Sequence, residues 1–401
     1  MEDASKGKKL TALRVAAALA AGFIGAVIIW IITPFNNFTL YNGYISDSYL
    51  PVTALFIMIA VMLIINPLIG LIKRPLMFTK QQLAIMFGIL LIACALPGDG
   101  LLRVLPYSLS KTTVEITTGK EYADAFNRMK IRPELFPGKT EYGANNPQAE
   151  KMFTGFLKDE PLPWGAWVKP LVSWGIFILF CWLMMGSLAA IVLPQWRDNE
   201  KLPFPLVEVA QSYIEEPEKG LLPELYKSRG FWIAFIAIAA LHSMNMLAQY
   251  MPDRVPAIPL TLDITGIFTQ PPLVYIPGTF FKTPIYFIFI AMGFFMPFRM
   301  GFSIWFFSLA YALYSALGRT YVPNFSALTV NDHRTGAMLV LTAYVIWLGR
   351  AHWMMVVKSM FFRLKGDAAF RDALSGWLFV IGCVGMIGWK LGFGVGVLAL
   401  I

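Results

Sequence analysis

The sequence predicts an all-α polytopic membrane protein: a transmembrane helical bundle of about nine spans, with broken or re-entrant segments and a small exterior loop domain. Hydrophobic residues make up 57% of the 401 residues, and charged residues only 14%, whereas soluble domains carry roughly 25% charged residues. The mean hydropathy is +0.61. The formal net charge is +9, but no part of the sequence resembles a soluble, basic nucleic-acid-binding domain. We therefore assign the positive charge to the loops between membrane spans and expect no nucleic acid partner.

The candidate spans are apolar stretches near the length of about 20 residues that crosses a bilayer. They cover residues 11–33, 50–72, 81–97, 167–193, 231–249, 284–298, 300–318, 336–357 and 374–393. No small-residue cleavage site follows the first stretch, which predicts a retained helix and not a removed signal peptide. Lysine and arginine concentrate in alternate connections, and the loop 34–48 has neither. The positive-inside bias therefore places the amino terminus in the cytoplasm.

The polar segments divide the chain into three regions. Residues 1–110 form a first helical group with a broken third span, and residues 111–165 an exterior cap loop of mixed charge. Residues 166–401 form a second helical group. Within that group we expect a cytoplasmic amphipathic segment at 194–230 and an exterior, proline-rich loop at 250–283.

The third span is interrupted by the turn Pro97–Gly98–Asp99–Gly100. The 14 apolar residues before it form roughly 21 Å of helix, which is shorter than the hydrocarbon thickness of about 30 Å. If residues 101–109 complete the crossing, the turn lies at membrane depth beside protein or a watery cavity. Because short, interrupted segments point to substrate sites in transporters, we expect Asp99 and Arg103 to face such a cavity. Otherwise the helix ends at Pro97 and Asp99 lies in solvent.

Other polar residues inside apolar sequence are further candidates for substrate binding. Glu208 lies in a short amphipathic segment that is either an interfacial helix or a re-entrant hairpin. His242 and Asn245 share one face of the fifth span and either bind substrate or supply interhelical hydrogen bonds. The seventh span repeats this pattern with Tyr311 and Ser315.

Three basic residues near span ends have simpler interpretations. Arg299 is expected to be a single positive-inside residue in a tight hairpin. Arg350 and His352 lie near the inner end of the eighth span, and we expect both to extend to the lipid headgroups.

Small residues mark the last span as a packing surface. Glycines recur there every three or four residues, which clears one face for a neighbouring helix; they are Gly382, Gly385, Gly388, Gly392 and Gly396. The sequence stops at GVLALI without a polar tail. We therefore expect a further membrane chain, or a C-terminal portion beyond Ile401, to pack on this helix.

Motifs for catalysis and cofactors are missing from the sequence. It has no phosphate-binding loop, no nucleophile elbow, no zinc-protease motif and no dinucleotide fingerprint. The histidines have no helical ligand spacing, and the three cysteines have no paired spacing. We therefore expect no enzyme activity, no cofactor and no metal site.

Four stretches together resemble a known family. They are LIACALPGDGLLR (91–103), EPLPWGAWVKPLVSW (160–174), LPQWRDNEKLPFPLVEVAQ (193–211) and SRGFWI (228–233). In this order they resemble an uncharacterised family of bacterial polytopic membrane proteins that is distantly related to the oligopeptide transporter superfamily. The resemblance implies a bundle with re-entrant segments in the bacterial cytoplasmic (inner) membrane, and import of a peptide-like or metal-chelate solute.

Two hypotheses for function follow. The first is a secondary transporter, or part of one, with a cavity formed by the broken third span and by the polar faces of the fifth and seventh spans. The second is a non-catalytic membrane-anchoring or scaffold subunit of a larger membrane complex, which docks other helices on its glycine face. The sequence identifies neither the substrate nor the coupling ion, the direction of transport or the oligomeric state.

Overall fold

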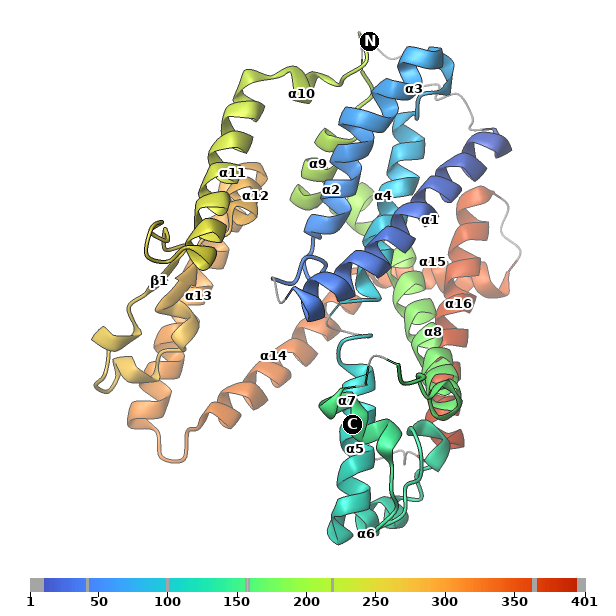
Figure 1. The fold of residues 1–401 in the computed structure, drawn as a ribbon, viewed down its shortest axis with the longest axis vertical. Coiled ribbons are helices and arrows are strands. Elements are labelled where there is room, and N and C mark those ends of the chain that lie inside the picture. Colours follow the sequence, from blue (N-terminus) through green and yellow to red (C-terminus); the bar gives the residue numbers. More distant parts are fainter. Residues whose placement is uncertain are drawn as a thin grey trace. The chain divides into compact units, whose positions relative to one another are not determined.

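A computed structural model describes residues 11–40, 43–98, 101–155, 157, 159–217, 220–362 and 366–394. In these residues the chain is overwhelmingly helical, and the two strands have three residues each. The predicted all-α class is therefore confirmed (Figure 1). The longer helices are α1 (Ala12–Pro34), α2 (Val52–Ala60), α3 (Asn66–Lys73), α4 (Lys80–Ala95), α5 (Leu105–Thr118), α6 (Lys120–Met129), α7 (Pro147–Thr154), α8 (Trp164–Pro194), α9 (Pro205–Tyr213), α11 (Arg229–Tyr250), α12 (Phe287–Phe295), α13 (Phe298–Tyr321), α14 (Ala327–Leu348), α15 (Arg350–Phe361) and α16 (Asp367–Gly392).

Each predicted span contains a helix, but not every helix is long enough to cross a membrane. Among the described residues six helices are long and apolar enough, or seven if α14 and α15, which are bent by 68°, form one span. The prediction of about nine spans also counted α4 and α12. These helices have only 16 and nine residues, too short for a hydrocarbon core about 30 Å thick. The chain is thus a multi-pass integral membrane protein whose apolar helices contact lipid.

The chain forms two compact units, and each combines segments that are far apart in sequence. The first unit contains Met1–Cys94 and Pro203–Thr342, and the second contains Ala95–Leu202 and Ala343–Ile401. The first boundary falls beside the LPGDG turn. Residues 101–104 form turns, and α5 then begins at Leu105 and packs on α6 and α7.

The core of the first unit joins α1, α2 and α4. Ile29, Met58 and Leu83 are fully buried there, and apolar residues of α9 pack on the same core. Three buried hydroxyls lie within it, where Thr33 Oγ1 and Ser46 Oγ are 2.7 Å apart and Ser46 Oγ and Thr53 Oγ1 are 3.3 Å apart. This chain of hydrogen bonds satisfies polar groups that would be costly to bury alone.

The rest of the first unit contains α11, α12, α13 and most of α14. Between α11 and α12 the chain is irregular, with three 3-10 turns, η6 (Thr265–Ile267), η7 (Leu273–Tyr275) and η8 (Gly278–Phe280). Two strands, β1 (Thr261–Asp263) and β2 (Lys282–Pro284), pair antiparallel with Thr261 opposite Pro284. We call residues 251–286 the outer segment, because the sequence predicts that this part of the chain is exterior.

The second unit is built on close packing of α8 against α16. A Cβ atom on Gly382 would lie 2.7 Å from the backbone nitrogen of Met184, and one on Gly385 would lie 2.4 Å from the ring of Phe180. These two glycines thus let the helices approach, as the glycine pattern predicts. Gly388 and Gly392 have open space instead, and Gly396 lies outside the described residues.

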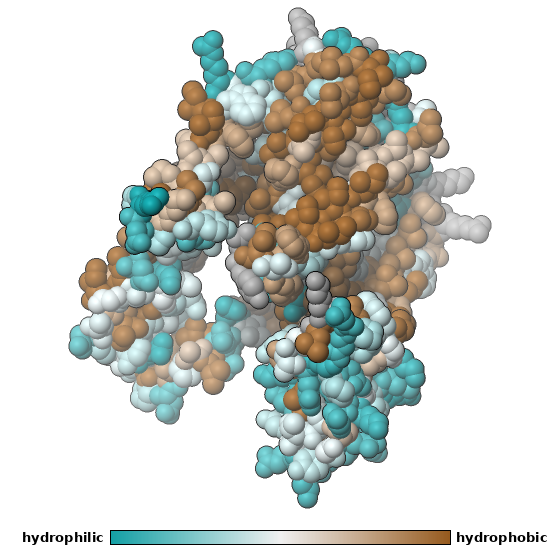
Figure 2. All heavy atoms as spheres, viewed as in Figure 1, coloured by the Kyte–Doolittle hydropathy of each residue, from teal (hydrophilic) through white to brown (hydrophobic). Residues whose placement is uncertain are grey.

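The helices α5, α6 and α7 form a small lobe in the second unit. Ile116, Ala123 and Phe126 form its core, and the buried side chain of Asn146 bonds both backbone groups of Lys139. Its surface is largely hydrophilic in Figure 2, whereas apolar side chains cover the visible faces of α1 and α2. The lobe corresponds to the region where the sequence predicts a small cap outside the bilayer.

Candidate functional site

The predicted polar residues of α11 contact the outer segment and the first residue of α12. The side-chain amide nitrogen of Asn245 donates to the carbonyl oxygen of Ile258 at 2.9 Å, and the Ile258 amide donates to Asn245 Oδ1 at 2.7 Å. One turn earlier on the helix, the His242 ring meets Phe287 edge to face, with centroids 5.9 Å apart. Asn245 thus replaces the backbone partners that Ile258 would have in regular secondary structure.

The polar face of α13 reaches the same segment. The buried Ser315 hydroxyl donates a long hydrogen bond of 3.4 Å to the Tyr275 carbonyl oxygen. One turn further along the helix, the Arg319 guanidinium lies over the Tyr275 ring, 4.7 Å from its centroid. Tyr311 lies one turn before Ser315 and is 37% exposed. Asn245 and Ser315 therefore share one structural element as their partner, the outer segment, whereas His242 contacts the first residue of α12.

The remaining predicted site residues lie elsewhere. Glu208 is exposed on α9, whereas its neighbour Val209 is buried in the core of the first unit. Arg103 belongs to the second unit, in the turn before α5. Asp99, central to the predicted cavity, lies outside the described residues.

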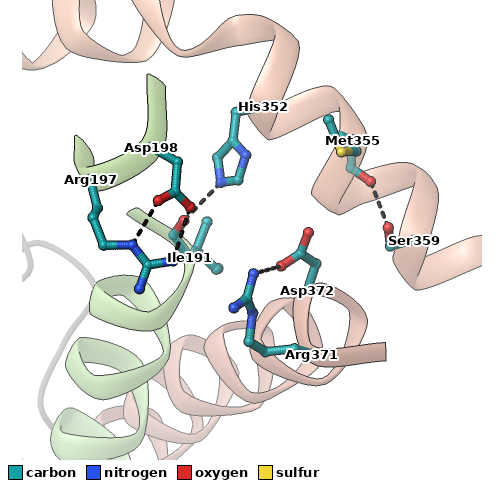
Figure 3. A network of polar contacts seen from close by, with 8 residues as sticks. All are labelled: Ile191, Arg197, Asp198, His352, Met355, Ser359, Arg371 and Asp372. Carbon is teal, nitrogen blue, oxygen red and sulfur yellow. Dashed lines mark hydrogen bonds and ion pairs between the residues drawn. The ribbon is translucent and has the colours of Figure 1, made fainter. Parts of the chain in front are cut away.

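A second polar cluster lies in the second unit, where α8 ends (Figure 3). Pro194 interrupts α8, and residues Gln195–Asn199 continue as a π-helix, η5. The amide of Gln195 donates to Val192 and not to Ile191, four residues before it. The Ile191 carbonyl therefore lacks its usual intrahelical partner. A buried carbonyl of this kind needs another donor.

His352 of α15 supplies that donor. Its ring nitrogen Nε2 lies 2.7 Å from the Ile191 carbonyl oxygen, and the residue is only 9% exposed. Because a carbonyl only accepts, Nε2 carries the proton in this contact.

Charged side chains accompany His352 in this cluster. Arg197 holds Asp198 through two hydrogen bonds of 2.7 and 3.0 Å. On α16, Arg371 Nη2 lies 3.5 Å from Asp372 Oδ1, and Asp372 is only 6% exposed. In Figure 3 these groups come from η5, α15 and α16 and lie near one another. The cluster, defined as Arg197, Asp198, His352, Arg371 and Asp372, thus offers two carboxylates and an imidazole for proton transfer or charge pairing.

The sequence interpretation of His352 was wrong. It placed the side chain at the lipid headgroups, whereas the ring is buried and bonded to α8. Arg350 is exposed and lies over Trp347, 4.8 Å from the ring centroid, with one hydrogen bond to the Trp347 carbonyl.

Sequence reasoning also missed Asp372 as a member of this cluster. The sequence signal is the helical spacing of Asp372, Ser375 and Gly376, which share one face of α16. All three residues are buried in the structure.

No group of three or more histidine, cysteine, aspartate or glutamate residues suited to a metal ion occurs in the part of the chain that the structure describes.

Comparison with known proteins gives one match. The model of a family described as a family of unknown function (DUF6785) matches residues 8–401. No curated protein and no solved structure matches the chain.

Proposed function

The chain belongs to the DUF6785 family, and from its own chemistry we propose that it is a secondary transporter, or the membrane part of one, for a polar solute. The single observation that carries this proposal is the attachment of the irregular outer segment to polar side chains of two apolar helices, through Asn245 and Ser315.

The depth of these contacts supports the proposal. Asn245 precedes the last residue of α11 by five positions, and Ser315 precedes the last residue of α13 by six. At 1.5 Å per residue this is about 7 to 9 Å of helix. Where the ends of these two helices coincide with the membrane surface, irregular backbone at this position is tolerated only against protein or a water-filled cavity. Transporters use interrupted segments of this kind around their substrate sites.

The chemistry of the contacts indicates the class of solute. Asn245 presents an amide that both donates and accepts, and Ser315 and Tyr311 present hydroxyls. In the proposed mechanism the outer segment leaves these groups, which then bind the amide and carbonyl groups of the solute in place of Ile258 and Tyr275. A peptide-like solute, or a chelate with amide or hydroxamate groups, fits this set. The sequence resemblance to the oligopeptide transporter superfamily points to the same class.

The test is uptake by bacterial cells that express the chain. The probes are a radiolabelled tripeptide and a radioactive ferric hydroxamate chelate. Asn245→Leu removes both hydrogen bonds to Ile258 and one solute-binding group, so it should reduce uptake of the transported probe at least several-fold. Asn331→Leu, on an exposed position of α14, is the matched control and should transport normally. Uptake of both probes at the level of cells without the protein would contradict the proposal.

The alternative is a scaffold subunit, and the open space beside Gly388 on α16 is the observation that favours it. A scaffold needs no movement of the outer segment. In a variant without native cysteines, Ser315→Cys should then stay protected from a water-soluble maleimide in the presence and absence of either probe. A transporter instead predicts labelling that a bound solute changes.

A further inference from the structure

An apolar cavity lies between α12 and α13 in the first unit. Its volume is about 460 Å³, within the range of about 300–1,000 Å³ found for small-molecule sites. On α13 its lining residues fall at i, i+3, i+4 and i+7 and so share one helix face; they are Phe298, Gly301, Phe302 and Trp305. Gly293 and Met296 line the side of α12.

Both glycines of the cavity face open space. A Cβ atom on Gly293 or on Gly301 would have no other atom within 4 Å. The surrounding aromatic side chains are well exposed, with 86% for Phe298 and 60% for Trp305. The helix α13 is long and apolar enough to span a membrane, so this surface meets lipid, and hydrocarbon fills such a space without loss of hydrogen bonds.

One positive charge, Arg299, is next in sequence to the lining residue Phe298. Arg299 also precedes Phe302 by three residues, which places it beside the lining face at the turn between the helices. No aspartate or glutamate occurs between residues 284 and 321, so the hairpin itself offers no carboxylate to this guanidinium. An arginine without a carboxylate at the end of an apolar groove complements a phosphate attached to an acyl chain.

We propose that this groove binds one anionic phospholipid, with an acyl chain on the aromatic face of α13 and the headgroup phosphate on Arg299. This site is independent of the proposed transport function. It also gives Arg299 a second role, in addition to the topological one that the sequence predicts.

The experiment uses the full chain in vesicles that contain phosphatidylglycerol with a photoactivatable acyl chain. Labelling of the peptide that spans Gly293–Trp305 is measured by mass spectrometry. Because one arginine contact with an anionic lipid contributes about 1 kcal/mol, Arg299→Gln should reduce labelling about five-fold. Arg229→Gln, at the start of α11, is the matched control and should label like the parent. Arg299→Lys should retain an intermediate signal.

A second variant tests the cavity itself. Gly301→Leu places a side chain in the open space and should abolish labelling, although Arg299 remains. Gly336→Leu, on α14 where a Cβ also has open space, controls for the substitution. Unlabelled phosphatidylglycerol should compete, whereas phosphatidylcholine and inorganic phosphate should not.

Two results would overturn the lipid site. The first is equal labelling in the parent, Arg299→Gln and Gly301→Leu proteins. The second is competition by inorganic phosphate alone, which would indicate an anion site without an acyl chain.

Discussion

At the scale of single residues, the contact between His352 and Ile191 shows how a helix defect creates a polar site. Pro194 and the π-helix after it redirect the Gln195 amide to Val192, and the freed Ile191 carbonyl accepts from His352. Sequence reasoning did not predict the π-helix. It therefore had no reason to bury His352, because the donor that pairs with a freed carbonyl depends on a helix that is 161 positions away.

The first prediction concerns this hydrogen bond. His352→Leu leaves the buried Ile191 carbonyl unpaired and should lower the free energy of unfolding by about 1–3 kcal/mol. His352→Gln retains an N–H donor and should recover most of the loss. The measurement is thermal unfolding of the purified protein in detergent. Equal midpoints for the leucine and glutamine variants would show that the carbonyl does not depend on the histidine.

The second prediction concerns Tyr226, outside the spans. Its ring is 2% exposed and its hydroxyl donates to the Tyr213 carbonyl at 3.2 Å. Burial raises the pKa of the Tyr226 phenol well above its ordinary value near 10, and the neighbouring Tyr213 raises this pKa further. The folded state therefore favours the neutral phenol. This stabilisation is complete below about pH 10 and is lost as the pH rises through the folded pKa.

Thermal unfolding midpoints above about pH 10 measure this effect. The parent protein should lose stability with rising pH more steeply than Tyr226→Phe, which has no phenol to ionise. Tyr122→Phe, at a 57% exposed position, should behave like the parent. Identical slopes for all three proteins would indicate that Tyr226 does not titrate with unfolding.

At the scale of secondary-structure elements, α16 shows both the strength and the limit of pattern reasoning. The glycine spacing correctly indicated a surface for close helix packing, because small residues lower the distance between helix axes. The expected neighbour was a further membrane chain or a C-terminal portion beyond Ile401, because every apolar helix is a possible partner and the spacing does not identify which one packs there. In the structure that neighbour is α8 of the same chain for Gly382 and Gly385, and only the positions further along remain open.

The third prediction compares two glycines of α16. Gly382→Ala places a methyl group 2.7 Å from the backbone of Met184, so the helices must separate, and the free energy of unfolding should fall by about 1–3 kcal/mol. Gly388→Ala has open space and should be neutral or stabilise the helix by up to about 1 kcal/mol. Both effects are read from unfolding midpoints. A larger loss for Gly388→Ala than for Gly382→Ala would mean that another chain packs tightly at Gly388.

At the scale of the whole molecule, hydrophobicity predicted the class and the position of every apolar helix. It overestimated the number of spans, because α4 and α12 are apolar but short. It also assigned contiguous regions, whereas the compact units combine distant segments, with a boundary at Cys94 and another at Leu202. Long-range pairing leaves no trace in local hydropathy. For the same reason, sequence analysis singled out Asn245 and Ser315 as polar residues in apolar helices, but it did not predict that both contact the outer segment.

The last prediction concerns the orientation of the chain in the membrane. Basic residues gather between α8 and α11, at Arg197, Lys201, Lys227 and Arg229, and the positive-inside rule assigns that connection to the cytoplasm. If α8 crosses the bilayer once, the α5–α7 lobe, which precedes α8, lies on the exterior side. In a variant without Cys94, Cys181 and Cys383, Lys120→Cys in the lobe should react with a membrane-impermeant maleimide on intact spheroplasts.

Glu224→Cys, in α10 (Glu224–Lys227), should react only after the membrane is permeabilised. Both positions are exposed, so a difference in labelling reports the side of the membrane and not burial. The reverse pattern would invert the topology and place the outer segment in the cytoplasm. Labelling of both positions from outside would mean that α8 does not cross the bilayer, because it is the one long apolar helix between them. The assay thus tests the orientation on which the outward position of residues 251–286 depends.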